Sequence, residues 1–208
     1  MKFFSLTLCL IITTSSFAQP TTEYKTPTQY QLDSLRTELA EIFMKDQTFR
    51  NIYKEAEDKL GADSDAYDYF WEVVEAQDKI LEKQVSNIID KYGWLGISQI
   101  GRLANTTLWV VLQHGSVSTK EKYAPLLKAS VLKEESQGIH YARLIDRMLI
   151  NSDKPQLYGT QYTYDNPSAF FEIEEPELIN KRRKEIGLNS IQEFSQSINI
   201  EWKIAQKQ

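Results

Sequence analysis

Apolar residues recur at three- and four-residue intervals along most of the chain, the spacing that gathers them on one face of an α-helix. Two long stretches show this pattern first, residues 29–59 and 66–91, and a polar loop over 60–65 separates them. Gly61 and Gly93 lie where these stretches stop, as expected for glycine at a helix end. The pattern predicts two long helices joined by a short loop.

Three shorter helices are expected next. The first begins at a Ser98 cap and ends at Gly115, and because it is apolar on nearly every side we place it at the centre of the fold. The second covers 118–135 and opens with STKE, a capping box, while Pro125 either kinks this helix or restarts it. The third covers 139–151 and is expected to form an antiparallel hairpin with the second.

The periodicity changes after Pro155. The run LYGTQYTY alternates roughly by two and is rich in β-branched and aromatic residues, DNPS at 165–168 favours a turn, and AFFEI at 169–173 offers a partner strand. A lone hairpin is only marginally stable in water, so this segment must pack on the helices. We expect a short β-hairpin or extended arm near 156–174.

Two further helices complete the pattern. In EEPELINKRRKEIGL the acidic residues come first, Pro176 lies in the first turn, the basic residues come last and Gly187 marks the end. Ser190 with Glu193 caps a final helix. The fold class expected is therefore mainly α, a single domain over 29–208 with six or seven helices.

The first 18 residues have the features of a cleavable export signal. Lys2 precedes a short apolar run, FFSLTLCLII, and the small residues of SFA end at Ala18. This run is too short to span a bilayer, and no later apolar run is long enough, so no transmembrane span is expected. Cleavage after Ala18 would leave 190 residues. They begin with a disordered leader over 19–28, and the mature protein is expected in the periplasm or outside the cell.

Cysteine content and charge exclude several classes of function. The only cysteine, Cys9, lies inside the export signal, either as an ordinary apolar position or as a lipid-anchored cysteine. The mature chain therefore has no disulfide, no thiolate nucleophile and no cysteine metal site. The formal net charge is −5, or −6 without Lys2, which disfavours nucleic acid as a partner. The basic run KRRK at 181–184 is expected to complement a helix dipole.

The best candidates for catalysis are His114 and Asp146. An imidazole is the natural general base near neutral pH. Asp146 is expected to point inward, and a buried carboxylate needs a partner, for which His114, Arg50 and Arg183 are the candidates. An Asp146–His114 pair would fix the imidazole tautomer as in hydrolases, but no G-x-S-x-G nucleophile motif is present. His140, after a glycine at a helix start, is expected on the surface.

A second set of residues points to binding. Asp46 and Arg50 have the spacing of an ion pair on one helix face, which is either solvated or directed into a polar pocket. QLYGTQ at 156–161 combines amides, hydroxyls and a glycine that permits close backbone approach. Its polar groups either satisfy helix ends or form the neutral wall of a ligand pocket. The candidate ligand-binding residues are Asp46, Arg50, Gln113, Arg147, Gln156, Tyr158, Gly159, Thr160, Gln161 and Arg183.

Metal and cofactor sites have little support. The two histidines lack the H-x-x-x-H spacing of a zinc site, and the acidic run EIEE at 172–175 lies outside any EF-hand loop. Phosphate-binding loops and dinucleotide fingerprints are also absent from the sequence. No metal and no cofactor are therefore expected.

Several short motifs follow one another in an order that resembles an uncharacterised bacterial family, a domain of unknown function. The resemblance covers roughly residues 30–195 and implies one shared fold, but it implies no activity. Leu95 departs from the pattern, which has proline after YGW. The motifs are KDQTFR at 45–50, Asp78, YGW at 92–94, Gly101, WVVLQHG at 109–115, LIDR at 144–147, QLYGTQ at 156–161, and R-x-x-x-G-L from Arg183 to Leu188.

The function expected from these residues is that of an exported, non-catalytic domain. It would bind a small polar ligand or a protein partner through the polar residues named above. One alternative is a hydrolase-like enzyme in which Asp146 orients His114 as the general base. The other is a purely structural role, in which the same residues form a satisfied buried network.

Overall fold

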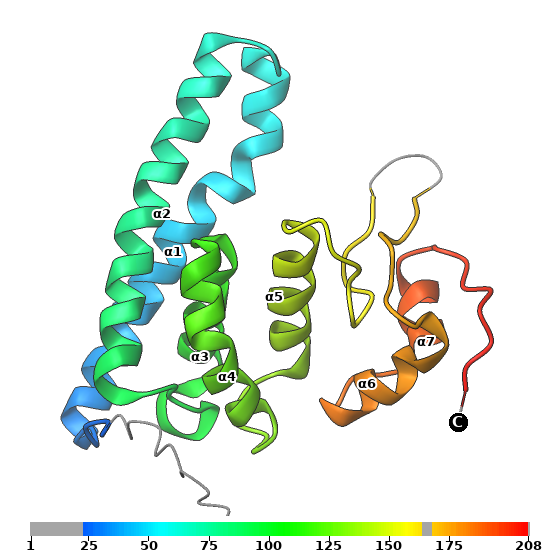
Figure 1. The fold of residues 1–208 in the computed structure, drawn as a ribbon. Coiled ribbons are helices and arrows are strands. Elements are labelled where there is room, and N and C mark those ends of the chain that lie inside the picture. Colours follow the sequence, from blue (N-terminus) through cyan, green and yellow to red (C-terminus); the bar gives the residue numbers. More distant parts are fainter. Residues whose placement is uncertain (1–22, 164–167, 208) are drawn as a thin grey trace, which may run out of the picture.

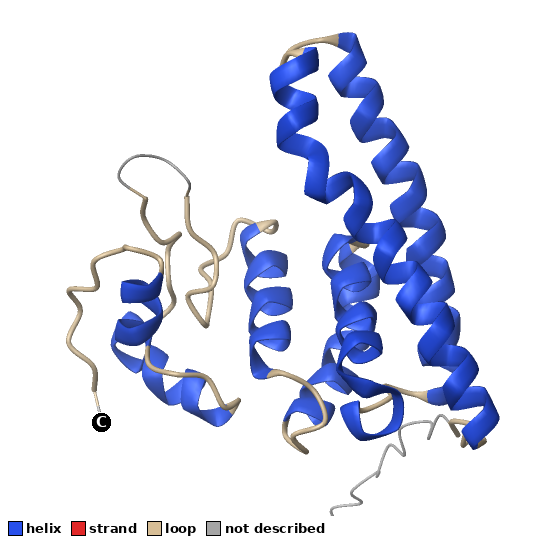
Figure 2. Ribbon diagram, turned by 180° about the vertical axis from the view of Figure 1, so that it is seen from behind, coloured by secondary structure: helices blue, strands red, loops and turns tan. Residues whose placement is uncertain are grey.

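The computed structural model describes residues 23–163 and 168–207, which form seven α-helices and one 3-10 helix. The export signal expected over 1–18 lies outside the described residues, and so does most of the turn expected over 165–168. The helices pack around one hydrophobic core, so the mainly α fold expected from the sequence is confirmed (Figures 1 and 2).

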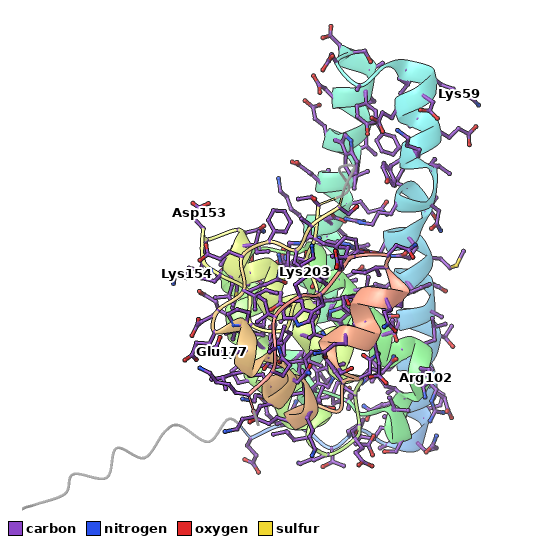
Figure 3. All side chains as sticks on the ribbon, turned by 90° about the vertical axis from the view of Figure 1, so that its right-hand side faces the viewer. Lys59, Arg102, Asp153, Lys154, Glu177 and Lys203 are labelled. Carbon is purple, nitrogen blue, oxygen red and sulfur yellow. The ribbon has the colours of Figure 1, made fainter. Side chains whose placement is uncertain are left out.

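Helices α1 (Gln29–Leu60) and α2 (Asp65–Tyr92) form a long antiparallel hairpin, as the two apolar stretches predicted. Each begins at a hydroxyl cap, because the side chains of Thr28 and Ser64 accept a hydrogen bond from a backbone N–H of the first turn. The closed end of the hairpin projects beyond the other helices, with Lys59 near its tip (Figures 1 and 3).

Three helices pack beside this hairpin: α3 (Ile97–His114), α4 (Val117–Val131) and α5 (Gly138–Ile150). Helix α3 lies between the hairpin and α5 (Figure 1). The central place expected for it is confirmed, because its second half is almost wholly buried. Its buried residues include Ala104, Leu108, Trp109, Val110, Val111 and Leu112.

The start of α3 differs from the prediction. Its cap is Gly96, and the N–H of Gly96 donates to the side-chain oxygen of Gln99 at 2.9 Å. Ser98 lies inside the helix, where its N–H donates to the Glu135 carboxylate at 2.8 Å. Gly101 then interrupts the helix with a φ of 79°, a conformation that favours glycine.

The start of α4 also differs from the prediction. Ser116, rather than Ser118, is the cap, because its hydroxyl accepts the N–H of Thr119 at 3.2 Å. The helix continues through Pro125 and ends at Val131, four residues before the predicted end. Residues 132–134, which were expected to continue the helix, form turns.

The segment over 156–174 takes the extended-arm form. Over 156–163 and 168–174 the structure shows no continuous strand, only a parallel bridge between Gln156 and Ile173 and an antiparallel bridge between Tyr162 and Phe170. The arm lies beside α5, on the side away from α3 (Figures 1 and 2).

The C-terminal part is built from short helices. The single helix expected around Pro176 is divided into a 3-10 turn η1 (Pro176–Leu178) and α6 (Ile179–Glu185), and Glu175 before them has a φ of 39°. Helix α7 (Ile191–Ser197) begins at the predicted capping box of Ser190 and Glu193, which is confirmed.

The described part of the expected leader has a defined path. The N–H of Lys25 donates to the carbonyl of Lys91 at 2.9 Å, so residues 23–28 are tied to the end of α2. Residues 19–22 lie outside the described part of the chain. Among the described helices, none combines the length and apolar character that crossing a bilayer requires.

Candidate functional site

Asp146, on the inner face of α5, holds the extended arm in place. Its carboxylate is fully buried and accepts the N–H groups of Leu157, Tyr158 and Thr160 at 2.9 Å each, and the Thr160 hydroxyl at 2.8 Å. Burial raises the pKa of this carboxyl, and the four hydrogen bonds oppose the rise because they favour the charged form. Asp146 is buried as predicted, but its partners are three backbone N–H groups and the Thr160 hydroxyl of the arm.

Gly159 allows this arrangement. Its φ is +69°, which favours glycine, and an added Cβ would lie 2.9 Å from the Cδ1 atoms of Ile179 and Ile191. The close backbone approach expected at this glycine is therefore present, and the arm lies directly on α6 and α7.

Two more of the predicted ligand-binding residues serve the arm itself. The buried Gln156 amide donates to the carbonyls of Gln161 and Phe171 at 2.8 and 3.0 Å and accepts the N–H of Gln161 at 2.9 Å. The buried Arg183 guanidinium donates to the Tyr158 carbonyl at 2.6 Å and to the Asn189 carbonyl at 2.7 Å. Both side chains therefore satisfy backbone groups that would otherwise be buried without partners.

His114 pairs with a different carboxylate from the one predicted. Its Nδ1 lies 3.0 Å from Oδ1 of Asp46, and the other oxygen of Asp46 accepts the Gln47 amide at 2.6 Å. Asp46 is 1% exposed and His114 is 25% exposed at the side chain. The predicted His114–Asp146 pair is wrong, because Asp146 faces the arm while α1 brings Asp46 against the end of α3.

Arg50 extends this cluster to α2. Its guanidinium lies 2.6 Å from the Asp78 carboxylate and 3.5 Å from the Asp46 carboxylate, and it also donates to the Asp46 carbonyl at 2.8 Å. The predicted Asp46–Arg50 pair is present, but Asp78 is the closer partner. Because Asp46 is buried, the pair is not simply a solvated one.

His140 does not lie on the surface. It is 6% exposed, and its ring stacks on that of Trp109 with 4.0 Å between centroids and 3° between planes. Burial, together with the nearby Arg143 and Arg102, lowers the pKa of His140 to about 4. The surface prediction is wrong because α5 turns this position towards α3.

A polar groove is lined by residues of α3, α5 and the arm. Its volume is about 670 Å³. Four predicted binding residues line it, Gln113, Arg147, Thr160 and Gln161. The sequence analysis did not predict the other lining residues. Two of them could have been found from helix spacing, because Trp109 lies four residues before Gln113 and Arg143 four residues before Arg147, which places each pair on one helix face. The remaining lining residues are Trp109, Arg143, Ile150, Asn151, Tyr162, Thr163 and Phe171.

The groove is positively charged. In the part of the chain that the structure describes, Arg143 and Arg147 form no ion pair, and no acidic residue lines the groove. Arg147 donates from Nε to the Gln161 side-chain oxygen at 2.7 Å, which fixes the guanidinium. Nearby, Lys120 is only 4% exposed, and burial and the charge of Arg147 lower its pKa. This charge stands out in a chain with a net charge of −5.

The described residues offer little to a metal ion. Over 23–163 and 168–207, no three side chains of histidine, cysteine, aspartate or glutamate come together in a way that would hold one. The ligand chemistry of the groove is instead that of guanidinium, amide and hydroxyl groups, which suits an oxyanion.

Comparison with known proteins agrees with the resemblance seen in the motifs. No curated protein and no solved structure matches the chain. Residues 33–205 match a family described only as a family of unknown function, DUF6624. Because this match covers most of the 208 residues, the chain belongs to that family.

Proposed function

We propose that the protein is a non-catalytic domain that binds a small anionic ligand in the groove between α3, α5 and the arm. The observation that carries this proposal is the pair Arg143 and Arg147, two cations without a carboxylate partner among the described residues. Guanidinium groups match carboxylate and phosphate oxygens with two parallel hydrogen bonds, so such a pair favours an oxyanion.

The surroundings support the same function. Arg147 is oriented before any ligand arrives, because Gln161 accepts its Nε–H. Gln161 is in turn fixed by Gln156, and Thr160 by Asp146. A preorganised site loses less conformational entropy on binding. Of the buried polar residues of the arm, Thr160 and Gln161 line the groove, while Gln156 supports it from behind through Gln161.

Thermal unfolding in the presence of simple anions tests this function. A ligand that binds the folded state raises the melting temperature, so acetate, citrate or phosphate should stabilise the wild-type protein at constant ionic strength. The double variant R143Q/R147Q should lose the shift. R102Q is the matched control, because Arg102 is exposed and does not line the groove. An equal shift in the double variant would refute the proposal.

A second candidate function is general-base catalysis at His114. The observation that favours it is the 3.0 Å contact of His114 Nδ1 with the buried Asp46. Such a contact fixes the tautomer and leaves Nε2 able to accept a proton from a water molecule. His114 is still the general base, as in the hydrolase expected from the sequence, but Asp46 takes the orienting role that was expected for Asp146.

Turnover of activated esters tests this second function. Wild-type protein should hydrolyse p-nitrophenyl esters faster than H114Q, and D46N should lie between the two if its fold is intact by circular dichroism. Equal rates for wild type and H114Q over a panel of acyl and phosphoryl esters would exclude His114 as a general base.

We further propose that the chain is exported and cleaved after Ala18, so that the mature protein acts in the periplasm or outside the cell. The support is the sequence of residues 1–18, with its basic start, short apolar run and small residues before the cleavage point. N-terminal sequencing of the secreted or periplasmic fraction should begin at Gln19. Retention of the intact N-terminus in the cytosol would contradict export, and a lipid-modified Cys9 would contradict cleavage after Ala18.

A further inference from the structure

Two buried polar atoms on one wall of the groove have no hydrogen-bond partner among the described residues. They are Nε1 of Trp109, a donor, and Oε1 of Gln113, an acceptor. Trp109 is 8% exposed and cannot turn its indole N–H freely towards water. Orphaned buried groups of this kind are rare in folded proteins and call for a missing partner.

The two atoms lie on the same side of α3. Residues four apart on a helix are neighbours, about one turn or 5.4 Å along the axis. Gln113 Nε2 donates to the Arg143 carbonyl at 3.3 Å, which assigns the amide orientation and leaves Oε1 as the free atom. This bond is long for N–H···O, so turning the Gln113 side chain into the groove loses little.

Arg143 and Arg147 repeat the same one-turn spacing on α5, and both line the groove with Trp109 and Gln113. The residues that line the groove therefore carry an N–H donor, a C=O acceptor and two guanidinium groups. A peptide group supplies the complementary C=O and N–H. In an N-acylated amino acid a carboxylate lies one carbon away from that peptide group, so one small molecule carries all three groups.

We infer that the ligand is an N-acylated amino acid, either free or as the C-terminal residue of a peptide. Its carboxylate binds the two arginines, its amide C=O accepts the Trp109 N–H, and its amide N–H donates to Gln113 Oε1. This inference rests on the proposed anion-binding function and specifies its ligand.

A series of three carboxylates of similar length tests the inference by calorimetric titration of the full mature protein. N-acetylglycine has the carbonyl and the N–H, levulinate has the carbonyl alone, and pentanoate has neither. Affinity should fall by about fivefold at each step, as expected for the loss of one hydrogen bond to a buried group. W109F should erase the step from levulinate to pentanoate, and Q113M the step from N-acetylglycine to levulinate.

The outcomes separate this inference from the function on which it rests. Equal binding of all three carboxylates, abolished in R143Q/R147Q, would overturn the acylamino ligand and leave anion binding intact. Failure of these and all other anions to bind would overturn both.

An N-acetylated tetrapeptide ending in glycine then identifies the source of the ligand. Binding at least as tight as that of N-acetylglycine assigns a polypeptide C-terminus, and exclusion of the peptide assigns a free acylamino acid. Circular dichroism checks the fold of each variant, and the wild-type series alone decides the case if a variant fails to fold.

Discussion

At the scale of single residues, one carboxylate organises the arm that forms a wall of the groove. Asp146, itself fully buried, accepts four hydrogen bonds from Leu157, Tyr158 and Thr160. We expect D146N to lower the free energy of unfolding by roughly 3 kcal/mol, because an amide group must turn N–H donors towards backbone N–H donors. Urea unfolding measures the loss.

The matched control for this variant is D63N. Asp63 is exposed in the loop between α1 and α2, so the same chemical change there should alter stability by less than about 0.5 kcal/mol. A loss in D146N no larger than that in D63N would show that Asp146 does not anchor the arm.

His140 gives the molecule a pH dependence of known direction. The folded protein keeps this ring neutral down to a pKa of about 4, whereas the unfolded chain takes up the proton near 6.5. The stability that comes from the neutral ring is therefore complete above pH 6.5 and is lost as the pH falls towards 4. The loss should reach roughly 3 kcal/mol.

Denaturant unfolding of wild type and H140Q at pH 7 and pH 4 measures this effect. Other groups titrate over the same range, so the informative quantity is the difference between the two proteins. H140Q should lose less stability than wild type on acidification, and an identical loss in both would show that His140 is not held neutral by the fold.

At the scale of elements, the caps determine where the helices begin, and they distinguish two nearby serines. Ser116 accepts the Thr119 N–H at the start of α4, whereas Ser118 lies in the first turn. We expect S116A to cost about 1 kcal/mol of stability and S118A less than half of that. A larger loss in S118A, measured by thermal or urea unfolding, would restore the capping box that the sequence suggested.

The helices themselves could be predicted from the sequence because their signal is local. Apolar spacing located α1, α2 and α5 to within one or two residues, and the Ser190–Glu193 box located α7. The starts of α3 and α4 were misplaced because several residues in each loop are able to cap, and tertiary contacts decide among them. Ser98, for example, meets the Glu135 carboxylate, 37 residues away.

The arm shows a different limit of prediction. Its alternating sequence favoured a strand, but side chains take the place of a strand partner: Gln156 bonds to backbone groups within the arm, and Asp146 binds three of its N–H groups. No local pattern in the sequence reveals this substitution. Gly159 was the one local sign, since a glycine between bulky residues marks close backbone approach.

At the scale of the whole molecule, the site depends on contacts between distant parts of the sequence. The His114–Asp46 contact joins residues 68 apart, and the groove combines α3, α5 and the arm. The motifs identified most of these residues as candidates, but their pairing follows from how α1 and α5 pack on α3. Trp109 and Arg143 were missed because a tryptophan on an apolar helix and an arginine on a polar face are unremarkable in sequence.

The most direct test of the central claim, an anion-binding groove at Arg143 and Arg147, is a nitrogen–proton NMR titration with acetate followed at the indole groups. The Trp109 signal, assigned by its absence in W109F, should shift and saturate in wild type but not in R143Q/R147Q. The Trp71 signal should stay still, because Trp71 packs among the aromatic rings of the α1–α2 projection. A Trp109 signal that does not move, or that moves equally in the double variant, would contradict the account.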